Sequence, residues 1–71
     1  MEELIILVSE ILNLDKKDIS LDTERENTPS WDSLNHIRLI AEAEERLNIR
    51  IPFESVPNIR KIGDFLDYIK E

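Results

Sequence analysis

The residues best suited to chemistry lie together near the middle of the chain, where Asp32, Ser33 and His36 fall within five positions. Ser33 offers a hydroxyl oxygen, and Asp32 stands where a helix N-cap belongs. A serine followed three residues later by a histidine also suggests a hydrolase. A hydrolytic dyad needs an oriented base, an oxyanion hole and a pocket that excludes water, and a chain with one glycine and one histidine offers none of these. The sequence therefore favours Ser33 as an attachment point or a helix cap, and we expect no enzyme activity.

Ligands for a metal ion are scarce. The chain has no cysteine, which excludes disulfides and thiolate sites, and its one histidine, His36, excludes a multi-histidine site. Five acidic residues that precede Asp32 in the segment 14–32 suggest calcium, but an EF-hand loop needs a central glycine, and this segment has none. We therefore expect a solvated acidic loop and no metal site.

The composition indicates one small acidic domain that spans residues 1–71. Nine basic and sixteen acidic residues give a formal net charge of −7. Such a surface repels nucleic-acid phosphates and anionic lipid headgroups and attracts basic protein partners. The apolar run at 4–8 is too short to span a bilayer and lacks the basic flank of a signal peptide. We expect a cytoplasmic protein with no membrane span.

Three segments carry the spacing of amphipathic helices. The first lies near the N-terminus, the second runs from about residue 33 to 47 behind the Asp32 cap, and the third closes the chain. The residues expected to face inward are Leu4, Leu7, Val8, Ile11 and Leu12 in the first, Leu34, Ile37, Ile40, Ala41 and Leu47 in the second, and Ile62, Phe65, Leu66 and Ile69 in the third.

Two connections complete the predicted fold. The segment 14–32 is long for a loop in so small a domain, and its apolar residues Leu14, Ile19, Leu21 and Trp31 indicate that it is pinned across the bundle. Between residues 49 and 60 two prolines leave room for a short fourth helix, at 53–56 or at 57–60. The fold class is therefore all-α: a small four-helix bundle with three main helices, one short helix and a long ordered first loop.

Several short motifs, in matching order and at matching distances, resemble the acyl carrier proteins, the phosphopantetheine-binding four-helix domains. Asp32-Ser33-Leu34 resembles the attachment motif of that family. Glu44-Glu45 and the hydrophobic-Pro sequence at 49–52 resemble the end of its second helix and the entry to its third. Residues 67–69 resemble its last helix, so the resemblance covers nearly the whole chain.

The resemblance implies a chemistry for the serine. Ser33 would accept 4′-phosphopantetheine from coenzyme A through a separate phosphopantetheinyl transferase, and Asp32 would assist the metal-dependent step of that transferase. The terminal thiol of the arm would carry an acyl or aminoacyl group as a thioester, which a chain without cysteine cannot do with its own residues. A tethered phosphodiester would also sit favourably at the positive end of a helix dipole.

Some residues depart from the family pattern. Asn35 and Arg38 stand where carriers of fatty-acid synthesis often have acids, which indicates a dedicated carrier of a specialised pathway. Ser30-Trp31 stands where the family commonly has glycine shortly before the Asp-Ser pair, and Trp31 is expected to anchor the loop rather than contact the arm. The residues expected to meet the arm or a partner enzyme are Leu34, Asn35, His36, Arg38 and Phe53, although Phe53 also fits the edge of the core.

Two interpretations from different classes stay open at this level. In the first, the chain is a monomeric carrier that presents thioester-bound intermediates to loading and processing enzymes. In the second, it is an unmodified acidic helical module that binds a basic protein. Modification of Ser33 distinguishes them.

Overall fold

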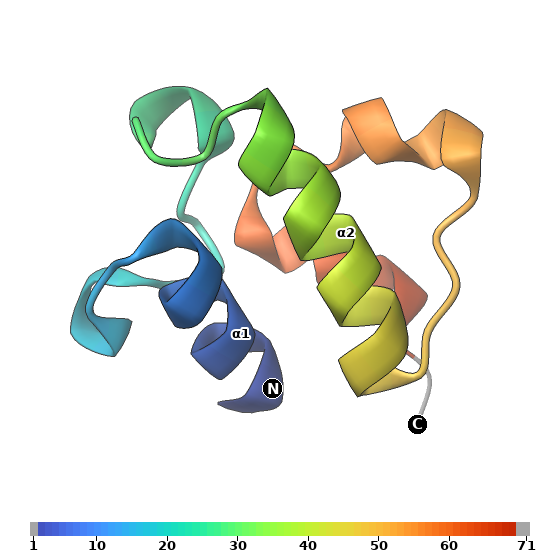
Figure 1. Ribbon diagram of the computed structural model, residues 1–71, viewed down its shortest axis with the longest axis horizontal. Coiled ribbons are helices and arrows are strands. Elements are labelled where there is room, and N and C mark those ends of the chain that lie inside the picture. The colour runs from blue at the N-terminus through green and yellow to red at the C-terminus, as the bar shows by residue number, and fades with distance from the viewer. Residues whose placement is uncertain (1, 70–71) are drawn as a thin grey trace.

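The computed structural model describes residues 2–69 and shows an all-helical fold. Its elements are α1 (Glu2–Leu12), η1 (Lys16–Asp18), η2 (Arg25–Asn27), α2 (Ser33–Leu47), η3 (Phe53–Asn58) and η4 (Ile62–Tyr68), in which η denotes a 3-10 helix. No β-strand occurs within these residues. The predicted fold class is thus confirmed, with the difference that the two C-terminal helices are of the tighter 3-10 type (Figure 1).

The two α-helices follow their sequence patterns closely. Helix α1 buries four of the five residues of its predicted stripe, while Ile11 is half-buried. Helix α2 has the predicted bounds, and it ends at Asn48, whose left-handed conformation (φ 56°) lets its N–H donate to the Glu44 carbonyl. The Glu44 carboxylate also accepts from the Ile51 N–H at 2.9 Å, which fixes the turn out of the helix.

An ion pair links the outer surfaces of α1 and α2. Arg46 Nη1 lies 2.9 Å from Glu10 Oε1 and 3.9 Å from Glu42. The hydrogen bond that Arg46 donates to the Glu10 carboxylate raises the pKa of the Arg46 guanidinium above its already high ordinary value, so the arginine stays charged at neutral pH. Because both side chains are well exposed, the pair adds little to stability.

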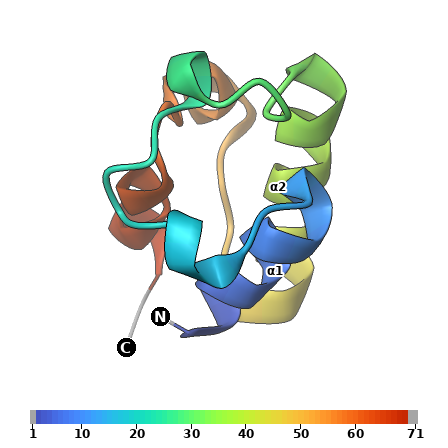
Figure 2. The ribbon, with the colours of Figure 1, turned by 90° about the vertical axis from the view of Figure 1, so that its left-hand side faces the viewer.

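The long first loop is pinned as predicted. Ile19 and Trp31 are buried, and Leu14 and Leu21 pack partly against the core. Backbone hydrogen bonds tie the loop to the entry of η4: Ile62 N donates to Thr23 O, and Gly63 N donates to Leu21 O. Figures 1 and 2 place η2, η3 and the first turn of α2 together at one end of the molecule.

A single apolar core joins these elements. Val56 and Ile59 close it, with Ile59 fully buried and Val56 partly so. Within η4, Ile62 and Phe65 are buried, whereas Leu66 is exposed because a 3-10 helix presents every third residue to the same side. The buried apolar residues are Leu4, Leu7, Val8, Leu12, Ile19, Trp31, Leu39, Ile40, Ala43, Ile51, Ile59, Ile62 and Phe65.

Helix α2 buries a different face from the one predicted. Leu34 and Ile37 are 69% and 57% exposed, and Ala41 is exposed as well, so their expected place in the core was wrong. The buried residues are His36, Leu39, Ile40 and Ala43. This stripe keeps the same helical spacing but begins on a polar residue, which hid it from a pattern based on hydropathy.

Candidate functional site

Ser33 is the first residue of α2 and is exposed to solvent. The residue before it, Asp32, has the extended backbone of an N-cap, and its Oδ1 accepts from Asn35 N at 2.9 Å. His36 N donates to Asp32 O at 2.8 Å, which closes the first turn. The cap predicted for Asp32 is therefore confirmed, and the serine hydroxyl stands at the open end of the helix.

The electrostatic environment at the start of α2 favours an anion attached there. Helix α2 has 15 residues and carries no acidic residue in its first turn. The N–H groups of its first residues have no acceptor within the helix and create partial positive charge there. A negatively charged group held on Ser33 Oγ would lie beside these N–H groups.

Two buried side chains, Trp31 and His36, are hydrogen-bonded to each other and support the start of α2. Trp31 is 2% exposed and His36 is 4% exposed. The Trp31 Nε1–H donates to His36 Nδ1 at 2.9 Å, and the two rings stack with their centroids 6.0 Å apart. Because an indole N–H can only donate, Nδ1 must accept, and the imidazole proton must reside on Nε2.

The other nitrogen of His36 reaches the third helix. Nε2 lies 2.8 Å from the carbonyl oxygen of Val56, to which it donates. One imidazole thus joins the loop before Ser33, helix α2 and η3. Since both ring nitrogens are satisfied, this polar side chain is buried without the cost of an unpaired group.

The structure corrects the role assigned to His36 and confirms that of Trp31. His36 was expected on the surface, in contact with the arm or a partner; it is instead buried and unable to meet either. Trp31 anchors the loop, as predicted. The signal that sequence reasoning missed is the tryptophan five residues before the histidine, a spacing that crosses the helix start and lets the two rings meet.

The other predicted contact residues differ in exposure. Leu34, Arg38 and Phe53 are exposed, and Phe53, at 89%, plays no part in covering the core. Asn35 is half-buried because its amide donates to the Ser30 carbonyl at 2.8 Å. Arg38 Nη1 approaches Asn35 Oδ1 at 3.4 Å, so the Asn35 side chain is largely committed to supporting the corner.

A comparison with known protein families identifies the family of this chain. The sequence model of the phosphopantetheine attachment site family matches residues 2–69. The chain belongs to that family. Its members are carriers rather than catalysts, so this chain is a non-enzymatic carrier that holds acyl groups as thioesters on a covalently attached 4′-phosphopantetheine arm.

Individual relatives support the same assignment. The carrier is 33% identical over 70 residues to an acyl carrier protein of Helicobacter pylori, covering 99% of this chain and 90% of that protein. It is 31% identical over 63 residues to one of Acidothermus cellulolyticus, covering 89% and 75%. An acyl carrier protein of Azobacteroides pseudotrichonymphae is 34% identical over 70 residues, covering 97% and 82%. Carrier function is thereby favoured over the unmodified interaction module.

The residues at the head of α2 fit a phosphopantetheine arm. An exposed hydroxyl stands beside the backbone N–H groups of the first helical turn at a rigidly supported helix start, and the chain has no cysteine of its own. When bound, the arm supplies the thiol on which a thioester is formed. For an arm attached at this position, the protein would supply the fixed root and the electrostatic environment of the phosphodiester.

Two further features bear on the sequence expectations. Among residues 2–69, no group of three or more histidine, cysteine, aspartate or glutamate side chains is arranged to hold a metal ion. Over the same stretch, no helix combines the length and the apolar character that crossing a membrane requires.

Proposed function

We propose that Ser33 Oγ is the atom to which the arm is attached. The observation that carries this proposal is the exposed serine at the first position of α2, behind the Asp32 cap. A phosphopantetheinyl transferase would join Oγ to the pantetheine phosphate of coenzyme A. The bond to the adenosine bisphosphate part would break, and the serine proton would leave to a base of the transferase. The test is the mass of the protein after incubation with coenzyme A and a permissive transferase.

The rigid root and the flexible arm have separate tasks in this proposal. The bridge from Trp31 through His36 to Val56 fixes the position of the helix start. The arm, attached outside the core, can then turn toward successive enzymes while its origin stays in place. The carrier acts as a cytoplasmic monomer that meets its transferase and its acyl-loading and acyl-processing enzymes in turn.

We propose two roles for Asp32, as helix cap and as a carboxylate needed during modification. Asp32→Asn keeps a good capping side chain, so its stability should stay within a few tenths of a kcal/mol of the parent, whereas Asp32→Ala should lose about 1 kcal/mol. Both variants should be modified about 10- to 100-fold more slowly, the range found when a supporting carboxylate is removed from a metal-dependent site. Thermal unfolding and the rate of mass gain measure the two effects. Modification of Asp32→Asn at the parental rate would reduce Asp32 to a cap.

We propose that partner enzymes dock on the exposed side of α2 next to Ser33. Leu34, Ile37 and Arg38 lie there on adjacent turns, and Phe53 is exposed on η3, the element that His36 ties to α2. Exposed apolar side chains beside the arm offer contact area without a cost in folding. Arg38 adds a cation, which suits partners of a specialised pathway that place an acidic residue opposite it.

Charge placed on this docking surface should weaken partner binding and leave folding intact. For Leu34→Asp and Ile37→Asp we expect unfolding free energies within about 0.5 kcal/mol of the parent, because both side chains are exposed. In the transferase reaction, KM for the carrier should rise about tenfold while kcat changes little. The control variant Asn13→Asp, at the exposed end of α1, adds the same charge and should leave KM for the carrier unchanged. An unchanged KM for both docking variants would exclude this surface for the transferase.

A further inference from the structure

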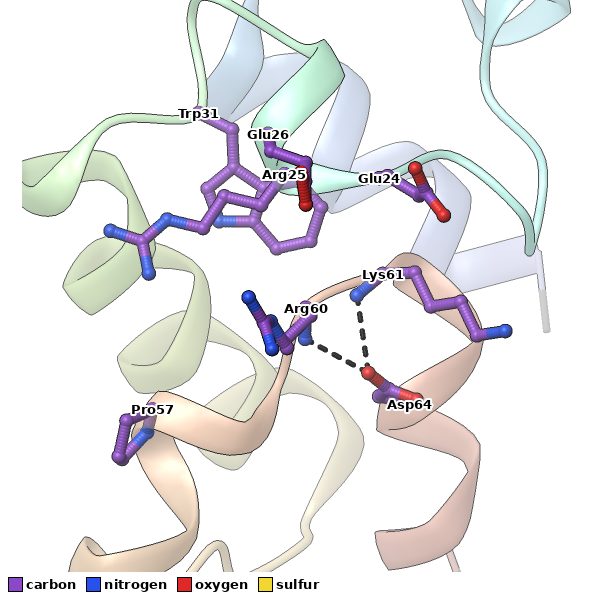
Figure 3. Close-up of a pocket in the computed structure, with 8 residues that line it drawn as sticks. All are labelled: Glu24, Arg25, Glu26, Trp31, Pro57, Arg60, Lys61 and Asp64. Carbon is purple, nitrogen blue, oxygen red and sulfur yellow. Dashed lines mark hydrogen bonds between the residues drawn. The ribbon is translucent and has the colours of Figure 1, made fainter.

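A hollow of about 740 Å³ lies between η2 and the link that joins η3 to η4. Figure 3 shows Arg25 and Arg60 on its two sides, with Trp31 and Pro57 bordering the space between them. Its volume falls in the range of sites that bind small molecules. Nothing described so far makes use of it.

The two arginines are held side by side by the backbone. Arg25 N donates to Arg60 O at 2.8 Å, and the neighbouring residues Glu24 and Lys61 form an antiparallel bridge. The two arginine side chains therefore leave the backbone at adjacent positions, although the residues are far apart in sequence. Figure 3 shows the Lys61 side chain pointing away from both arginines.

Neither arginine has an ion-pair partner among residues 2–69. Two of the three bordering acids are engaged with other groups. Asp64 Oδ2 accepts from the backbone N–H groups of Arg60 and Lys61, and Glu24 Oε1 accepts from Asn27 Nδ2. The third acid, Glu26, lies more than 4 Å from both guanidinium groups. The lining holds three cations and three acids, so its charges balance. The two arginines stand out because their guanidinium N–H groups have no acceptor among residues 2–69 and remain available to a ligand oxygen.

We propose that the Arg25–Arg60 pocket binds a carboxylate, and that this carboxylate is the far end of the acyl group carried on the arm. A guanidinium presents its N–H groups in a fork that matches the two oxygens of a carboxylate. The exposed Pro57 offers apolar surface for the short chain that leads to it. The proposal rests on the attachment at Ser33, which lies two residues after Trp31.

The tether favours a carried carboxylate over a free one. The pocket is open, and exposed ion pairs are weak in water. A free carboxylate should therefore bind only with a dissociation constant in the millimolar range. A short flexible arm raises the local concentration of its own cargo to about the same range, so a tethered carboxylate occupies the pocket for a large share of the time. The class of cargo that the structure selects is thus a short acyl group ending in a carboxylate.

The first experiment uses the protein without its pantetheine arm. Succinate is titrated while NMR follows the Nε–H signals of Arg25 and Arg60 and the Nε1–H signal of Trp31, with neutral succinamide as the comparison ligand. We expect shifts with succinate only, and at least about tenfold weaker binding in the double variant Arg25→Ala, Arg60→Ala. The matched control Lys16→Ala, Lys17→Ala removes the same charge from η1 and should bind like the parent. The substitutions leave the backbone bond between residues 25 and 60 intact.

The second experiment distinguishes a carried carboxylate from a free one. A permissive transferase loads the carrier from succinyl-coenzyme A or from butyryl-coenzyme A, which differ by the terminal charge. The succinyl form should shift both arginine signals without added ligand, and the butyryl form should not. Equal spectra of the succinyl and butyryl forms would overturn the assignment to the cargo. An absence of succinate binding to the parent protein in the first experiment would overturn the pocket itself. Failure to load the pantetheine arm would count against Ser33 as the attachment site, and the first experiment would then decide the pocket.

Discussion

Ser33→Ala should leave the protein folded and abolish the mass gain of one arm that the parent shows with coenzyme A and an active transferase. The substitution removes a single exposed hydroxyl, and alanine is well accommodated in the first turn of a helix, so the unfolding free energy should change by less than about 0.5 kcal/mol. The loss of modification should be complete, because the transferred phosphate needs an oxygen at this place to form its ester. Intact-protein mass spectrometry measures the result.

The control for this experiment is Ser20→Ala. Ser20 is exposed in the first loop, outside α2 and its cap, and its removal should leave the mass gain unchanged. Peptide mapping of the modified parent should place the added mass on the peptide that contains Ser33. A mass gain that persists in Ser33→Ala would move the attachment to another residue. An unmodified parent with several active transferases would contradict the attachment itself.

Trp31→Ala should produce the largest loss of stability of any single change at this end of the molecule. The indole is buried in the core and donates to His36, so its removal leaves a cavity and an imidazole nitrogen without its donor. Truncation of a buried tryptophan costs about 3–5 kcal/mol. For a domain of this size that corresponds to a fall in Tm of roughly 12–40 °C. Thermal and denaturant unfolding measure it.

Two further variants separate packing from hydrogen bonding at Trp31. Trp31→Phe keeps much of the ring and loses the N–H, and it should cost about 1–3 kcal/mol for the unsatisfied His36 Nδ1. Phe53→Ala removes an aromatic that is 89% exposed and should cost less than about 0.5 kcal/mol. If Trp31→Ala were no more destabilising than Phe53→Ala, the bridge would not support the helix start.

The bridge also explains why a polar residue occupies the buried face of α2. A buried histidine is unfavourable unless both nitrogens find partners, and here the partners come from the loop and from η3. The pairing orients the first turn of α2 and leaves Leu34 and Ile37 free on the other side. The residue that was expected to meet a partner directly therefore acts by positioning those that can.

Local features determined much of this fold from the sequence alone. The bounds of α2 and its Asp32 cap depend on residues within one turn of each other, and both were predicted correctly. The exposure of Ser33 follows from the same local geometry, since the first residue after a cap lies at the open end of the helix. The pinning of the first loop was also predictable, because buried area is the only favourable use for Ile19 and Trp31 in so small a domain.

The tertiary structure alone decided which face of α2 turns inward. That helix carries two apolar stripes, and hydropathy favoured the one with Leu34 and Ile37. The other was selected because Trp31 and Val56 satisfy His36, and these partners are brought to it only when the chain folds. The Arg25–Arg60 pocket depends on the same kind of information. Its two cations meet through a backbone bond between distant segments, and no spacing in the sequence reveals such a contact.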